Sequence, residues 1–63
     1  MFPIFEQPNT SERIAINPDR VTKVLRYQAD GQPETSLIYF AKDDVVAVLG
    51  SVGAVAEVLS RGR

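Results

Sequence analysis

The sequence contains no cysteine and no histidine among its 63 residues. Disulfide bonds are therefore impossible, and a zinc site is not expected because its usual ligands are missing. The same absences remove the common nucleophile–base pairs of covalent catalysis, so we expect a protein that is not an enzyme. We also expect no cofactor and no metal site. A chain without cysteine is typical of a reducing compartment such as the cytoplasm.

The chain also lacks a basic excess and a long apolar run. Seven basic and eight acidic residues leave a net charge of −1, whereas nucleic-acid-binding proteins usually carry a surplus of positive charge. The most apolar segment, 45–59, is interrupted by glycine, serine and glutamate and is shorter than the roughly 20 residues of a membrane span. Residues 1–6 do not have the basic start and apolar stretch of a signal peptide. We therefore expect no membrane span and a cytoplasmic location.

The length predicts one small domain that covers residues 1–63. A chain of this size buries only about 60 % of the surface that its unfolded form exposes. Small domains usually gain further stability from disulfides, metals or oligomerisation. Since the first two are excluded, we expect a homo-oligomer, with a dimer favoured.

Short apolar segments alternate with turn residues along most of the chain. Asn17 is suited to cap a turn that begins at Pro18, and Asp30-Gly31 is a hairpin signal. Lys42-Asp43-Asp44 marks a further turn. The alternation and the β-branched and aromatic residues predict strands at 2–5, 13–17, 22–29, 35–41 and 45–49.

One helix is expected after these strands. Ser51 is a good N-cap, and Gly62 is suited to end the helix. A helix of about ten residues is not stable alone in water, so it must pack on the sheet. Its apolar stripe consists of Val52, Val55, Ala56 and Leu59. The fold class is therefore α+β: an antiparallel four- to five-stranded meander sheet with one C-terminal helix packed on one face.

The last two predicted strands are apolar on both faces. One helix covers a single face, and soluble monomers rarely expose a large apolar patch. A second copy of the chain in a two-fold dimer would cover the other face. Alternatively, the N-terminal segment with Phe2, Ile4 and Phe5 folds over it. The residues that we expect at the contact surface are Phe5, Tyr27, Tyr39, Phe40, Val46 and Val48.

The sequence also contains candidates for a nucleic-acid site and an anion site, and each has a simpler structural explanation. Arg20, Lys23, Arg26 and Arg61, with Tyr27 and Tyr39 nearby, could bind single-stranded nucleic acid. On a strand, however, Lys23 and Arg26 point to opposite faces, and basic residues at a sheet edge also discourage unwanted pairing.

The second kind of site is an anion site at Gly50, Ser51 and Gly53, between a strand and a helix. The Walker and dinucleotide patterns are absent there. The simpler explanation is that Gly50 makes a turn, Ser51 caps the helix and Gly53 permits close helix–sheet contact.

Two segments, Ile16-Asn17-Pro18-Asp19-Arg20-Val21 and Gly50-Ser51-Val52-Gly53-Ala54-Val55, resemble the short flagellar-operon proteins of the FlbD/SwrD type. The resemblance extends over residues 14–59. The chain departs from the family pattern in its longer loop at 7–12 and in Gly53 and Ala54, where the family tends to be acidic. The resemblance implies a non-enzymatic accessory protein that acts through protein contacts.

We therefore expect a non-catalytic small accessory or regulatory protein, of bacterial or phage type, that acts through protein–protein contacts as a homo-oligomer with a further protein partner. The alternative is a small nucleic-acid-binding regulator that uses Arg20, Lys23 and Arg26.

Overall fold

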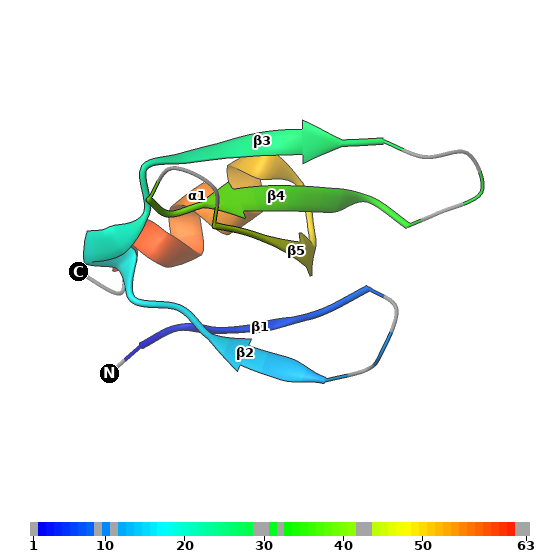
Figure 1. The fold of residues 1–63 in the computed structure, drawn as a ribbon. Coiled ribbons are helices and arrows are strands. Elements are labelled where there is room, and N and C mark those ends of the chain that lie inside the picture. The colour runs from blue at the N-terminus through cyan, green and yellow to red at the C-terminus, as the bar shows by residue number, and fades with distance from the viewer. Residues whose placement is uncertain are drawn as a thin grey trace.

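The computed structural model describes residues 2–8, 10, 12–28, 31, 33–41 and 44–61. It confirms an α+β fold with antiparallel strands and one C-terminal helix (Figure 1). Asp30, Lys42, Asp43 and Gly62, which we expected in turns and at the helix end, lie outside the described residues. The elements in order are β1 (Ile4–Glu6), β2 (Arg13–Ala15), the 3-10 turn η1 (Pro18–Arg20), β3 (Lys23–Tyr27), β4 (Thr35–Tyr39), β5 (Val45–Leu49) and α1 (Val52–Arg61).

The described strands form two sheets, so the single meander of four to five strands was wrong in its connectivity. β1 and β2 pair with each other, while β3, β4 and β5 form a separate three-stranded sheet. The division falls at η1, where Pro18 has no N–H to continue a ladder. Asn17 caps this turn as expected, because its side-chain oxygen accepts the Asp19 N–H at 3.0 Å. β1 lies next to β5 without a shared ladder (Figure 1).

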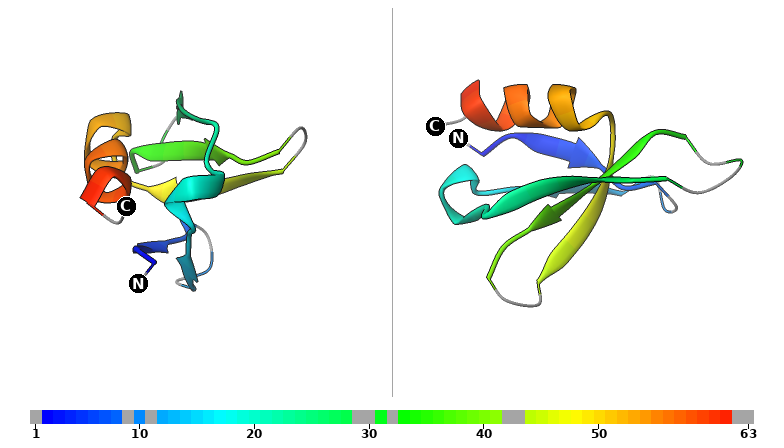
Figure 2. Two further views of the ribbon diagram at one scale, coloured as in Figure 1. Left: turned by 90° about the vertical axis from the view of Figure 1, so that its left-hand side faces the viewer. Right: turned by 90° about the horizontal axis from the view of Figure 1, so that it is seen from above.

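All parts of the fold contribute to one small core. The β1–β2 hairpin and the residue that follows it supply Phe5 and Ile16, the three-stranded sheet supplies Ile38 and Val48, and the helix completes the cluster. Figure 2 shows α1 running along one side of the molecule, next to the hairpin. The helix buries Val55 and Leu59, whereas Ala56 of the predicted stripe is exposed.

The hairpin packs on the same side of the three-stranded sheet as the helix. Phe5 is only 8 % exposed and belongs to the cluster that contains Val55. Phe2 and Ile4 remain exposed. The N-terminal segment therefore does not cover the second face of the sheet, which was the alternative to self-association.

The junction between β5 and α1 is fixed by backbone geometry and hydrogen bonds. Gly50 has a φ of +124°, a conformation that side-chain-bearing residues rarely adopt. Its N–H donates to the Glu34 carbonyl at 2.9 Å. Ser51 is the N-cap that we expected, because its hydroxyl oxygen accepts the Ala54 N–H at 3.1 Å.

Candidate interaction surface

The register of the three-stranded sheet defines which residues share a face. Directly opposite residues form rows across the strands, and successive rows point to opposite faces. The rows through Ile38 and Ser36 point into the protein, since both residues are fully buried. The remaining rows form what we call the outer face: Lys23, Tyr39 and Val45; Leu25, Leu37 and Ala47; and Tyr27, Thr35 and Leu49.

The outer face is mainly apolar and largely open to solvent, with Thr35 as the exception at 3 % exposure. Leu25, Tyr27 and Val45 are 43 %, 48 % and 47 % exposed. The other apolar residues of the outer face are half-buried: Leu37, Tyr39, Ala47 and Leu49. No outer-face residue belongs to the hydrophobic core or to the partly buried hydrophobic residues that pack against it. A continuous apolar face of this kind marks an interaction site more often than an ordinary surface.

One cation lies on the outer face, and it contacts an aromatic ring. The Lys23 Nζ is 4.8 Å from the centroid of the Tyr39 ring. The two residues are direct cross-strand partners between β3 and β4. Such a contact stabilises an exposed pair by about 0.5–1 kcal/mol. The exposed ammonium group therefore lies beside an aromatic ring of the same face.

The structure separates the six predicted interface residues into two groups. Tyr27 and Tyr39 lie on the outer face. Phe5 and Val48 are core residues, so they are not accessible for contact with a partner. Phe40 and Val46 are partly buried and pack against the core. These last four residues were predicted at the interface because they are apolar. Two of them belong to the core and two pack against it.

Sequence reasoning did not select five other apolar residues of the outer face. Two of them lie two residues from Tyr27 or Tyr39 along a strand, and the other three lie on β5 opposite Tyr39, Leu37 and Thr35. The alternation of side chains along each strand would therefore have assigned these residues to the outer face, once Tyr39 was known to lie on that face. These residues are Leu25, Leu37, Val45, Ala47 and Leu49.

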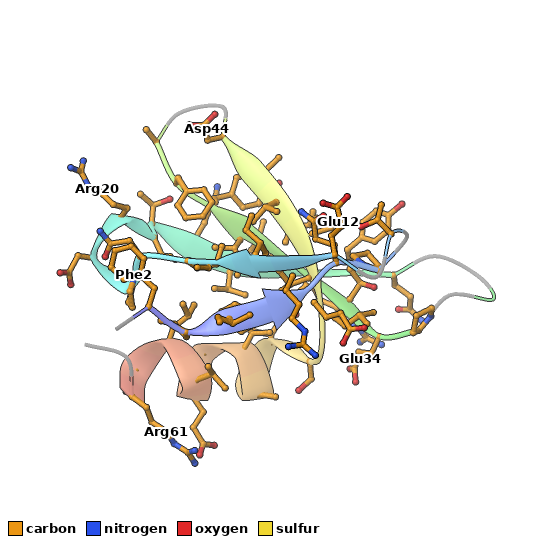
Figure 3. All side chains as sticks on the ribbon, turned by 90° about the horizontal axis from the view of Figure 1, so that it is seen from below. Phe2, Glu12, Arg20, Glu34, Asp44 and Arg61 are labelled. Atoms are coloured by element: carbon orange, nitrogen blue, oxygen red, sulfur yellow. The ribbon has the colours of Figure 1, made fainter. Side chains whose placement is uncertain are left out.

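The four cations of the nucleic-acid hypothesis are not brought together. Lys23 is on the outer face, and Arg26 is in a row of the opposite face. Arg61 forms an i,i+4 ion pair with Glu57 on the helix. Figure 3 shows Arg20 and Arg61 at different parts of the molecule. The described residues therefore provide no continuous basic surface from this set.

At the predicted anion site of Gly50, Ser51 and Gly53, two nearby N–H groups already donate within the protein, from Gly50 to the Glu34 carbonyl and from Ala54 to the Ser51 hydroxyl. The Gly50 carbonyl accepts the Ser36 hydroxyl at 2.8 Å, and the Ser51 hydroxyl caps the helix. Gly53 does not mediate a close helix–sheet contact, because an added Cβ would meet nothing within 4 Å. These observations support the structural explanation for Gly50 and Ser51 and correct the one for Gly53.

Two further features are absent from the part of the chain that the structure describes. Its acidic residues form no cluster of three that could hold a metal ion. Its one helix is too short to cross a membrane.

The chain was also compared with known proteins. No protein-family model, curated protein or solved structure matches it. The candidate site therefore rests on the geometry of the outer face.

Proposed function

We propose that this protein is a non-catalytic accessory or regulatory module that self-associates and acts through protein–protein contacts. The observation that carries the proposal is the outer face, where Leu25, Tyr27 and Val45 expose large apolar side chains on one continuous sheet surface. A second copy of the chain is the expected partner for part of this surface. A further protein contacts the rest, in the cytoplasm.

The total surface of the chain supports self-association. The accessible area is 4592 Å² for a mass of 6.9 kDa. A folded monomer of this mass exposes about 4,000 Å² on the usual scaling with mass. The excess of roughly 600 Å² is close to the 800 Å² or so that each partner buries in a standard interface. The chain thus exposes more surface than a typical monomer of its mass.

The small core supports the same proposal. Among the described residues it consists of six buried hydrophobic residues, and the chain has neither cysteine nor histidine. A core of this size stabilises a domain by only a few kcal/mol. Association adds stability because a second copy of the chain binds only the folded state. The resemblance to the short flagellar-operon proteins agrees with a non-enzymatic role of this kind.

Sedimentation equilibrium from micromolar to submillimolar protein tests the proposal. The wild-type chain is expected to show a mass above 6.9 kDa that increases with concentration. Leu25→Glu places a charge on the outer face and should raise the dissociation constant at least about tenfold, equivalent to 1.4 kcal/mol. Val58→Glu is the matched control, since Val58 is a similarly exposed aliphatic residue on the helix. A stable monomer throughout this range would overturn the proposal.

A further inference from the structure

The outer edge of β3 is the open edge of the three-stranded sheet. β3 pairs with β4 on one side, and none of the described strands pairs with its other side. In Figure 1, β3 forms the upper margin of the molecule, whereas β5 at the opposite edge borders β1. An open edge presents unpaired backbone N–H and C=O groups that can bind a further strand.

β3 is also unusually exposed for a strand of a small sheet. All of its residues except Val24 are exposed. They include the large apolar side chains of Leu25 and Tyr27, which point to the outer face. The edge therefore offers backbone hydrogen-bonding groups and apolar side chains in the same five-residue segment.

The order of residues in β3 allows the strand to pair with a second copy of itself. When two copies of Lys23–Tyr27 pair antiparallel about a two-fold axis at Leu25, Leu25 meets Leu25 of the other copy. Lys23 then lies opposite Tyr27, and Val24 lies opposite Arg26. Each cation thus faces an aromatic or aliphatic side chain, so this register avoids the direct opposition of like charges that destabilises a strand pair.

The two registers centred on a cation are less favourable on the same grounds. A pairing centred on Lys23 places two ammonium groups directly opposite each other, and one centred on Arg26 places two guanidinium groups opposite each other. Directly opposed like charges destabilise a strand pair. The register centred on Leu25 places no two cations directly opposite each other and uses the whole of β3.

From the open edge, the exposure of β3 and this charge pattern, we infer that two copies of the chain join through their β3 strands into one six-stranded antiparallel sheet. The inference rests on the proposed self-association and specifies its geometry. The two outer faces then form one apolar surface that extends across the dimer. This composite surface stays accessible for the further protein partner, because edge pairing covers β3 but leaves β4 and β5 open.

Single-cysteine variants test this geometry directly, since the chain has no cysteine of its own. Opposed Cα atoms in an antiparallel pair are about 4.5–5.5 Å apart, which is within the range of a disulfide. Leu25→Cys is therefore expected to form a covalent dimer as its main product under mild oxidation. Val45→Cys, which is equally exposed on β5, should remain uncross-linked.

A mixed pair of variants tests the register. Lys23→Cys and Tyr27→Cys should cross-link with each other when mixed, whereas each alone should not, because identical positions are about 14 Å apart along the strand. Failure of the mixed pair, with Leu25→Cys still cross-linking, would overturn the register centred on Leu25.

The alternative is packing of one outer face on another. Sheets packed face to face are about 10 Å apart, so no outer-face cysteine would form a direct disulfide there. Leu37→Cys, at the centre of the outer face, would instead be joined by a short bis-maleimide linker. If the protein sediments as a dimer and Leu37→Cys is joined by the linker while no variant forms a direct disulfide, edge pairing is overturned but self-association is not. If the protein sediments as a monomer, the proposed function itself is overturned.

Discussion

The hydroxyl of Ser36 donates a 2.8 Å hydrogen bond to the carbonyl oxygen of Gly50. Ser36 lies in the middle strand of the three-stranded sheet and is fully buried. Gly50 lies at the turn from which the helix starts. A single side chain therefore links the sheet to the start of α1.

Replacement of this serine should destabilise the fold. Ser36→Ala removes the donor and leaves the Gly50 carbonyl without this partner, which typically costs about 1–3 kcal/mol. Urea denaturation at fixed protein concentration should show a lower midpoint with an unchanged slope. Ser60→Ala, at an exposed position on α1, is the control and should change stability by less than about 0.5 kcal/mol. Equal effects of the two variants would contradict the role assigned to Ser36.

The two described glycines around the helix start should respond to alanine in opposite ways. Gly50→Ala forces a side-chain-bearing residue to a φ of +124° and brings its Cβ to 3.4 Å from Val55 Cγ2. We expect a loss of about 1–3 kcal/mol. Gly53→Ala adds a Cβ in open space within the helix and should stabilise by up to about 1 kcal/mol. Thermal unfolding of both variants measures this difference, and a stabilised Gly50→Ala variant would refute the conformational argument.

Two valines of β5 provide a matched test of which sheet face is the core. Val48 is completely buried, whereas Val45 is 47 % exposed on the outer face. Val48→Ala should cost about 2 kcal/mol, because it removes buried methyl groups and leaves a cavity. Val45→Ala should stay within about 0.5 kcal/mol of the wild type. Comparable losses in denaturation would show that the outer face is buried to the same extent.

Nucleic-acid binding is expected to be absent. The net charge is −1, Lys23 and Arg26 point to opposite faces, and Arg61 pairs with Glu57. Fluorescence anisotropy with labelled single-stranded DNA and RNA should therefore show no binding at low salt. An affinity that is measurable at low salt and falls steeply as salt is added would instead favour the regulator that uses Arg20, Lys23 and Arg26.

Local sequence signals predicted the elements well where a few neighbouring residues determine the structure. The strand Val45–Leu49 and the Ser51 cap were placed correctly, and so was the Asn17 cap. The strands predicted at 22–29 and 35–41 end earlier, at Tyr27 and Tyr39. The division into two sheets was missed, because the partner of a strand depends on contacts far away in the sequence.

The choice between the two sheet faces could not be made from the sequence for a related reason. The row Leu37 and Ala47 is as apolar as the row Ile38 and Val46, so composition does not indicate which one the helix covers. Ser36 adds a misleading signal, since a polar residue in the buried row suggests exposure. Its burial is possible only because the Gly50 carbonyl accepts its hydrogen bond.

The position of Phe5 in the core has a consequence for synthesis of the chain on the ribosome. Consecutive strands form every strand pair among the described residues, and such local contacts form quickly. Phe5, however, packs in the cluster that includes Val55 and Leu59, which are synthesised after all five described strands. In the nascent chain, Phe5 therefore lacks its packing partners in α1 until the helix has been synthesised.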